Sequence, residues 1–307
     1  MHHRPLGKTG LVVSEVGLGG NRLGQDYASD EHWIALVQRA ADLGVTIFDT
    51  AEAYGWGRSE EMLGRALGNR DDVVIATKMC RVRETGESEY SAARMMTTVE
   101  GSLRRLRRDV IDIYQLHSPR REHLERFDWA EGMAKLKAQG KIRVAAVAVN
   151  SAADGIWLME RDLMEGDLVE ALQITYNIFN IEAEERLFAL AEEKGVGLLC
   201  RMPLARGVLT GKFRPGQEVS DDHRATLDGD RMWENVRRAE DLRPIAETYE
   251  GGMTRLAHHF SLTPRAISAI IPGARTLAQL EENVAASNGV GLAGAVRAEI
   301  ERVRSTW

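Results

Sequence analysis

Four side chains of this sequence are suited to proton chemistry if the fold brings them together: Asp49, Tyr54, Lys78 and His117. Asp49, Lys78 and His117 each end a short apolar run of the kind that forms a buried strand, and Tyr54 follows Asp49 by five residues. A single charged residue at a strand end ordinarily marks the point where the chain meets water. Three successive strands that end in an acid, an ammonium group and an imidazole instead predict a shared site.

Together these groups can protonate an oxygen anion. A phenol is a weak acid at neutral pH, so we expect the Lys78 ammonium group to lower the pKa of Tyr54. Asp49 would hold Lys78 charged in a water-poor pocket, and His117 would donate a hydrogen bond to a carbonyl oxygen that gains negative charge. This is the chemistry that follows nucleophilic addition to a carbonyl group. None of the four supplies the nucleophile, so a cofactor must supply it.

Short apolar runs and amphipathic helices alternate along the chain and must position these residues. Because each crossover returns the chain to the same end of the sheet, the strands should be parallel. We predict an α/β fold, a (β/α)8 TIM barrel; an open doubly wound sheet is the alternative, since periodicity does not report closure. The predicted strands are residues 15–19, 46–49, 73–78, 111–117, 143–149, 171–175, 197–201 and 269–271.

Helices are predicted where apolar residues recur every three or four positions, with Gly44, Gly68 and Gly195 as C-terminal stops. An N-terminal β-hairpin over residues 4–13 is expected to close the barrel floor. Long loops are expected after strand three, at residues 81–90, and after strand seven, at residues 206–244. No linker divides the chain, so we predict one domain over residues 1–307.

Composition narrows the class of partner. The 307 residues carry a net charge of −6, which argues against nucleic acid as a partner, and no apolar run is long enough to span a membrane. Two distant cysteines suit a reducing compartment, and the first residues lack an apolar stretch of signal type, so we expect a cytoplasmic protein. No residues have metal-ligand spacing, and nothing in the sequence specifies an oligomeric state.

Several spaced motifs, in order along the chain, resemble the aldo-keto reductase family. They are Phe48-Asp49-Thr50-Ala51-Glu52-Ala53-Tyr54-Gly55 with Gly57 and Ser59-Glu60, Ala76-Thr77-Lys78, and Gln115-Leu116-His117-Ser118-Pro119. The resemblance implies a (β/α)8 barrel that uses NADPH, or less often NADH, to reduce a small aldehyde or ketone, or to oxidise the alcohol. It also implies that Asp49, Tyr54, Lys78 and His117 are the catalytic residues.

The segment from Ile271 to Thr276, which leads into a helix, is the candidate phosphate site, because a helix N-terminus favours anions. Thr276 and Gln279 also match a capping box, which needs no ligand. By the resemblance, Arg275 would contact the 2′-phosphate of NADPH, with Gln279 and Asn283 toward the adenine. All the predicted cofactor contacts are Gly20, Asn21, Arg22, Asn150, Gln173, Arg201, Pro203, Leu204, Gly207, Leu209, Gly273, Arg275, Gln279, Glu282 and Asn283.

Two residues depart from the family pattern. Ala148, in Ala148-Val149-Asn150, lacks the hydroxyl group that the family often carries after strand five, and Arg201 replaces a tyrosine that stacks on the nicotinamide ring. The guanidinium of Arg201 is planar and is able to stack instead.

Two alternatives to the enzyme stay open. One is a regulatory subunit that keeps the barrel and the cofactor but acts through a partner, and a remote one is a metal-assisted hydrolase. The substrate should be set by residues 20–28, 81–90 and 206–235, with Tyr27, Trp56 and Trp233 as candidate pocket residues or as packing under the loops.

Overall fold

The computed structural model describes residues 1–68, 70–161, 168–217 and 223–307. Its strands are β1 (His3–Pro5), β2 (Val12–Ser14), β3 (Leu18–Gly19), β4 (Ile47–Asp49), β5 (Val74–Met79), β6 (Ile111–His117), β7 (Ile142–Ala148), β8 (Ala171–Thr175), β9 (Gly197–Arg201) and β10 (Ile267–Ile270). Its α-helices are α1 (Asp30–Asp42), α2 (Arg58–Leu67), α3 (Ala92–Leu106), α4 (Arg121–Arg126), α5 (Trp129–Ala138), α6 (Ala152–Met159), α7 (Leu187–Lys194), α8 (His223–Asp241), α9 (Arg243–Thr248), α10 (Gly252–Leu262), α11 (Leu277–Val284) and α12 (Gly294–Arg304).

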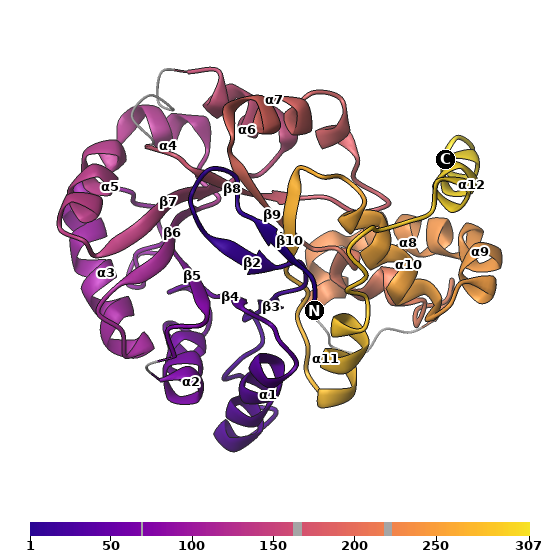
Figure 1. The fold of residues 1–307 in the computed structure, drawn as a ribbon, viewed down its shortest axis with the longest axis horizontal. Coiled ribbons are helices and arrows are strands. Elements are labelled where there is room, and N and C mark those ends of the chain that lie inside the picture. The colour runs from indigo at the N-terminus through magenta and orange to yellow at the C-terminus, as the bar shows by residue number, and fades with distance from the viewer. Residues whose placement is uncertain (69, 162–167, 218–222) are drawn as a thin grey trace.

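Strands β3 to β10 form one parallel sheet in sequence order, with the bounds of the predicted strands shifted by a few residues. The first and last strands then meet. Val16 bridges to Ile270, and the amides of Gly17 and Gly19 donate to the carbonyls of Ile270 and Pro272 at 2.8 and 2.9 Å. These backbone contacts close the sheet, so the predicted (β/α)8 barrel is confirmed. Figure 1 looks along the barrel and shows the helices arranged around the strands.

The predicted N-terminal hairpin is present and closes one end of the barrel. β1 pairs antiparallel with β2, and in Figure 1 the hairpin crosses the opening of the strand ring. Leu6, Leu11 and Val13 are buried in one cluster with aliphatic residues of the strands. That cluster is Leu6, Leu11, Val13, Ile47, Val74, Ala76, Ile113, Val144, Ala146, Ala171, Leu199 and Ala269. The hairpin therefore seals the floor with apolar contact and leaves the opposite end, where the strands finish, as the accessible face.

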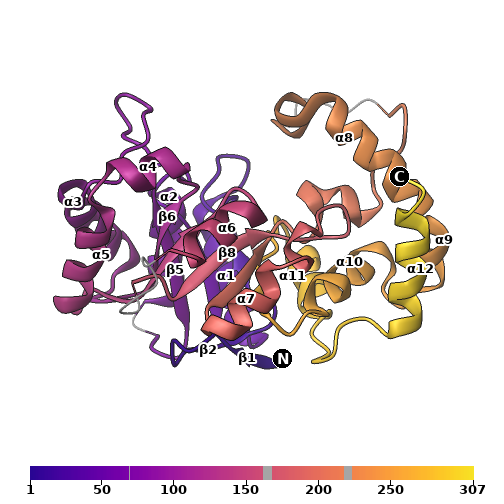
Figure 2. The same ribbon diagram turned by 90° about the horizontal axis from the view of Figure 1, so that it is seen from above.

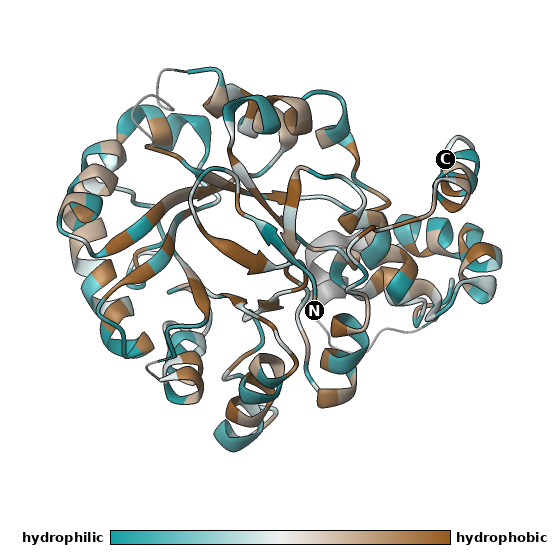
Figure 3. Ribbon diagram, in the orientation of Figure 1, coloured by the Kyte–Doolittle hydropathy of each residue, from teal (hydrophilic) through white to brown (hydrophobic). Residues whose placement is uncertain are grey.

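The helices bury one apolar side against the outside of the barrel. In α1, Ser29 caps the N-terminus by accepting from the His32 amide, and Trp33, Leu36 and Val37 are buried. Figure 3 shows hydrophobic colour concentrated on the strands and hydrophilic colour on much of the helices. The predicted stops at Gly44, Gly68 and Gly195 all have positive φ, which glycine adopts at no steric cost.

The long loop predicted over residues 206–244 is wrong over much of its length. A short 3-10 segment (Ala205–Thr210) is followed, after residues 218–222 that lie outside the described chain, by helices α8 and α9. Met232, Val236 and Ala239 are buried at helical spacing. Many charges and Gly229 concealed this narrow apolar stripe, although one stripe is enough to dock a surface helix. Figures 1 and 2 show α8, α9, α10 and α12 gathered on one side of the barrel, away from α3, α4 and α5. Residues 81–90 contain no helix and form a loop, as predicted.

Candidate active site

Side chains that point into the barrel form an apolar layer and, above it, a polar layer. Because strand side chains alternate, the residue two positions after an interior aliphatic residue also points inward. The aliphatic residues Ile47, Ala76, Ile113, Ala146, Ala171 and Leu199 belong to the floor cluster. Two positions after each of these lie Asp49, Lys78, Gln115, Ala148, Gln173 and Arg201. Since all the strands are parallel, these side chains meet at one end of the barrel, which His117 joins from the end of β6.

Asp49 and Lys78 form a buried ion pair in this polar layer. Lys78 Nζ lies 2.6 Å from Asp49 Oδ2 and donates to the Thr50 carbonyl at 2.7 Å. The two side chains are 4% and 0% exposed. The amides of Gln115 and Gln173 donate to Asp49 Oδ1 at 3.2 and 2.7 Å. Both carboxylate oxygens therefore have donors, which a charged pair needs when water is excluded.

Tyr54 lies in the loop between β4 and α2, beside this pair. Its ring packs edge-on against His117, with centroids 5.6 Å apart, and Lys78 Nζ lies 5.1 Å from the ring centroid. Burial raises the pKa of Tyr54, and the charges of Lys78 and Arg201 oppose this only in part. Lys78 lowers the pKa of Tyr54, as expected, but desolvation by burial is the larger effect and leaves that pKa raised. Tyr54 therefore keeps its proton.

His117 is a neutral imidazole. Burial, and then the charges of Lys78, Arg201 and Arg81, lower its pKa to about 3. In the described part of the chain its Nδ1 atom is buried without a hydrogen-bond partner. Because an orphaned buried N–H group is rarer than an orphaned acceptor, we assign the ring proton to Nε2. The hydroxyl of Tyr90 donates to the His117 carbonyl at 2.8 Å and anchors the end of β6.

A second set of buried hydrogen bonds holds the loop that carries Tyr54. The Thr50 hydroxyl donates to Ser59 Oγ at 2.7 Å, and Ser59 donates to the Gly20 carbonyl at 2.8 Å. On the neighbouring strand, Thr77 donates to Glu60 at 2.6 Å. The start of α2 is therefore tied to β3, β4 and β5, which fixes the position of the Tyr54 loop.

Arg201 brings an additional positive charge to the polar layer. Its guanidinium donates to Thr175 Oγ1 at 3.1 Å, to the Val149 carbonyl at 3.1 Å and to Ser118 Oγ at 3.5 Å. All three acceptors are uncharged. Burial lowers the pKa of Arg201, although arginine stays protonated at physiological pH. The site thus holds one more cation than the Asp49–Lys78 pair neutralises.

The candidate phosphate segment precedes α11, as predicted. Thr276 caps the helix by accepting from the Gln279 amide at 3.2 Å, and the Gln279 side chain accepts from the Arg275 amide at 2.9 Å. The Arg275 guanidinium lies 5.4 Å from the ring centroid of Tyr27. Asn283 is buried and donates to the Gly273 carbonyl at 3.3 Å. The capping interaction is therefore present without a ligand, while Gln279 is exposed and Arg275 is half-buried.

The predicted contacts after β9 lie in a strained turn. Positive φ occurs at Met202, Ala205, Arg206 and Gly207, and only the last of these is glycine. Such runs of left-handed backbone are found mainly at ligand sites. The segment contains the predicted residues Pro203, Leu204, Gly207 and Leu209. Leu209 is fully buried in the hydrophobic core, so its side chain is not available to a ligand.

Other predicted contacts lie on the same rim. Gly20 is packed so closely that a Cβ atom would lie 2.8 Å from the Asp49 carbonyl, and the following Asn21 is exposed. Arg22 donates to Gln25 at 3.3 Å. Asn150 donates to the Pro119 carbonyl at 2.9 Å. Glu282 is exposed on α11.

Ala148 occupies a position of the polar layer and brings no hydroxyl group to it. It is fully buried in the barrel interior, in register with His117 and Gln173. Its small side chain leaves room for these two larger neighbours in the polar layer.

Two adjoining cavities of about 750 and 680 Å³ open on the rim beyond β5, β6 and β7. The aromatic residues suggested for a substrate pocket line neither of them. Tyr27 packs on Trp33, Arg83 lies over the exposed Trp56 ring at 5.8 Å, and Trp233 packs against the core. The sequence missed Gln115, whose place two residues before His117 was the available signal, and the arginines of the rim cavities. In the described part of the chain, no helix is long and apolar enough to cross a membrane.

Comparison with known proteins gives consistent matches over nearly the whole chain. A model of the aldo/keto reductase family matches residues 15–304. The aldo-keto reductase YhdN of Bacillus subtilis is 32% identical over 92% of this chain and 87% of its own. A probable voltage-gated potassium channel subunit beta of Oryza sativa is 30% identical over 95% of this chain and 93% of its own. The solved holo form of an aldo-keto reductase from Bacillus halodurans has a TM-score of 0.83 and 28% identity, covering 99% of this chain and 96% of that one.

Proposed function

The chain belongs to the aldo/keto reductase family, and from that premise we propose that it is an NADPH-dependent oxidoreductase that reduces an aldehyde or ketone to an alcohol, reversibly. The observation that carries this proposal is the convergence of four groups in one polar layer. Lys78 lies 2.6 Å from Asp49 and 5.1 Å from the ring centroid of Tyr54, and that ring packs against His117.

Each of the four residues has a separate task in the proposed reaction. Tyr54 keeps its proton in the resting protein and gives it to the carbonyl oxygen as that oxygen becomes an alkoxide, a far stronger base than a phenolate. Neutral His117 donates an Nε2–H hydrogen bond to the same oxygen and so favours the charged transition state. Lys78 stabilises the tyrosinate left behind, and Asp49 keeps Lys78 charged and in place.

The residues of the rim fit a nicotinamide adenine dinucleotide phosphate. NADPH, when bound, supplies the hydride that adds to the carbonyl carbon. Arg275 and the N-terminus of α11 offer a positive charge and a helix dipole for the 2′-phosphate. At Gly20 there is no space for a Cβ atom, and Gly207 has a positive φ that larger residues rarely adopt. Arg201 is the proposed replacement for the stacking tyrosine, and NADH is the less favoured cofactor.

A regulatory role is the second candidate, favoured by the similarity to the rice channel subunit. In that role the barrel would bind NADPH and present it to a partner protein with little turnover. The complete set of Asp49, Tyr54, Lys78 and His117 favours the enzyme. For location we propose the cytoplasm, supported by the free thiols of Cys80 and Cys200.

The test is a panel of aldehydes and ketones followed by the loss of NADPH absorbance. Tyr54→Phe keeps the ring contacts with His117 and Lys78 but removes the proton, so we expect turnover to fall by about 10²–10⁴-fold while NADPH affinity is retained. Full turnover in Tyr54→Phe would overturn the proposed mechanism. NADPH binding without turnover of any substrate would favour the regulatory candidate.

A further inference from the structure

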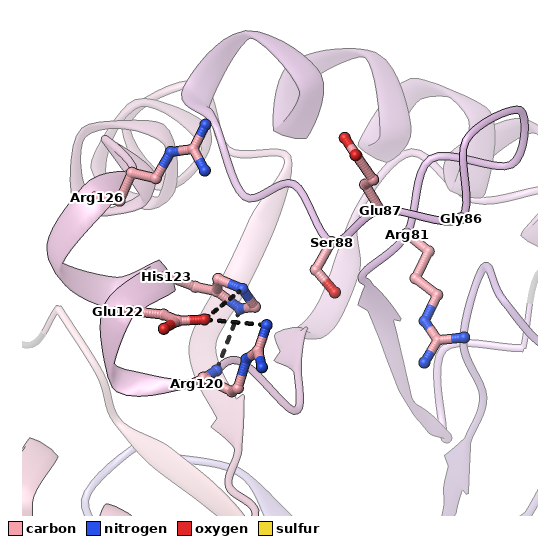
Figure 4. A pocket seen from close by; sticks show the side chains of 8 residues that line it. All are labelled: Arg81, Gly86, Glu87, Ser88, Arg120, Glu122, His123 and Arg126. Atoms are coloured by element: carbon pink, nitrogen blue, oxygen red, sulfur yellow. Dashed lines mark hydrogen bonds and ion pairs between the residues drawn. The ribbon is translucent and has the colours of Figure 1, made fainter.

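The two rim cavities form a continuous polar surface beside the proposed catalytic residues. They share Arg81, Ser88, Arg120 and His123, and Figure 4 shows these side chains facing the larger cavity. Arg81 and Ser88 belong to the loop that follows β5, which carries Lys78. Arg120 and His123 follow β6, which ends in His117. The cavities therefore lie over the strand ends that deliver two of the four central residues.

Apart from Gly86, the residues that line the two cavities all have polar or charged side chains. The larger cavity is lined by Arg81, Gly86, Glu87, Ser88, Arg120, Glu122, His123 and Arg126, and the smaller by Arg81, Ser88, Ser118, Arg120, Arg121, His123, Asn150 and Asp154. No aliphatic side chain is among them. Binding sites for apolar ligands are lined mainly by hydrophobic and aromatic side chains. This surface instead suits a polar substrate, whose hydrogen bonds to water can be replaced by hydrogen bonds to the protein.

Positive charge remains on this surface after internal pairing. Arg120 pairs with Glu122 at 3.0 Å, and Arg121 pairs with Asp154 at 2.8 Å. Within the described residues, the guanidinium of Arg81 has no ion-pair or hydrogen-bond partner. Figure 4 shows the Glu87 carboxylate pointing away from the Arg81 guanidinium.

This charge continues from the rim to the reacting groups. Ser118, which lines the smaller cavity, directly follows His117, and its hydroxyl lies 3.5 Å from the Arg201 guanidinium. Among the described residues, the Arg201 guanidinium donates only to uncharged acceptors. The charges of Arg201 and Arg81 both act on His117 in the direction that lowers its pKa, so both are electrostatically close to it. Cationic side chains therefore stand both on the rim, at Arg81 and Arg120, and in the polar layer, at Arg201.

The geometry points to a polar carbonyl substrate that carries an anionic group, a carboxylate or a phosphate, bound with that group toward Arg81 and Arg120 and its carbonyl toward His117. This inference rests on the proposed function, of which it names the substrate class. Arginine is the side chain best matched to both anions, because its planar donors pair with two oxygens at once. His123 forms a neutral wall of the site, since burial lowers its pKa, with a smaller effect from Arg120.

The first test compares a substrate that carries an anionic group with a neutral counterpart that lacks the charge. For the carboxylate, 4-carboxybenzaldehyde is compared with 4-carbamoylbenzaldehyde, and for the phosphate, glyceraldehyde 3-phosphate with glyceraldehyde. We expect the wild type to have at least about tenfold higher kcat/KM for one of the anionic substrates, a fold-change that corresponds to about 1.4 kcal/mol. The pair with the larger ratio identifies the anionic group.

Arg81→Gln and the double variant Arg81→Gln/Arg120→Gln should lower that ratio stepwise, toward one. Arg302→Gln is the matched control, because it makes the same charge change on an exposed residue of α12, on the other side of the molecule from α4 (Figures 1 and 2). An unchanged ratio in the double variant, or a ratio near one in the wild type, would overturn the inference.

A second measurement tests anion binding at the rim cavities independently of aldehyde reduction. Calorimetric titration with terephthalate and with inorganic phosphate at low salt should show that at least one anion binds at least about tenfold more weakly to the double variant than to the wild type or to Arg302→Gln. If no aldehyde is reduced but this difference holds, the proposed function fails and the anion site stands. If aldehydes are reduced while neither anion discriminates between the proteins, the anion site fails and the proposed function stands.

Discussion

Replacing Lys78 with methionine tests the polar layer without reference to any substrate. Methionine fills much of the same space but removes the ion-pair partner of Asp49, whose side chain is only 4% exposed. Removing one partner of a buried pair costs about 3–5 kcal/mol. Because Gln115 and Gln173 still donate to Asp49, we expect a loss near the lower end, about 3 kcal/mol of unfolding free energy.

The assay is urea unfolding followed by tryptophan fluorescence and circular dichroism. With a urea dependence of about 3 kcal/mol per molar, a loss of about 3 kcal/mol lowers the midpoint by about 1 M. Asp49→Asn in the Lys78→Met background removes the carboxylate that has lost its partner, so the double variant should be more stable than Lys78→Met alone. A double-mutant cycle measures the coupling directly, with an expected value of about 1–3 kcal/mol.

Lys135→Met is the matched control, because Lys135 is exposed on α5. Its effect should stay within about 0.5 kcal/mol. The reasoning is refuted if Lys78→Met unfolds at the same urea concentration as Lys135→Met. It is equally refuted if the costs of Asp49→Asn and Lys78→Met simply add in the double variant.

Three further predictions concern other parts of the molecule. His258 is buried with both ring nitrogens unpaired in the described chain, and burial lowers its pKa from 6.5 to about 3, so the unfolded chain alone takes up its proton as the pH falls through this window. The free energy of unfolding should therefore fall with pH below about 6.5, and His258 should account for about 2 kcal/mol of that loss at pH 5. Urea titrations at pH 8 and pH 5 should show that His258→Leu loses less stability than the wild type by about this amount. Equal losses in the two proteins would contradict the prediction. Gln115→Met removes a donor to Asp49 and should lower kcat about tenfold with an unchanged Kd for NADPH, whereas weakened NADPH binding with normal kcat would assign Gln115 to the cofactor instead. Arg275→Ala should weaken NADPH binding by at least about tenfold more than NADH binding in fluorescence titrations, and equal losses would exclude Arg275 from the 2′-phosphate site.

Much of the polar layer was predictable because a strand has a period of two. Once 47, 76, 113 and 171 are taken as interior positions, residues 49, 78, 115 and 173 must point the same way. The same rule would have found Gln115. The strand period does not predict α8, because a helix that lies on the outside of a domain needs only a narrow apolar stripe among many charges.

Residue types and spacing along the chain were enough to define the eight strands, the face of each strand that points inward, and the four residues that meet at one end. These properties are local, because backbone geometry repeats with a fixed period whatever surrounds it. Closure of the barrel was decided in three dimensions, where Val16 meets Ile270 from the other end of the chain. The protonation of Tyr54 and His117 was decided there too, since burial outweighs the charge of Lys78 for Tyr54 and reinforces it for His117. Desolvation depends on every segment packed around a group, and neighbours along the chain do not report it.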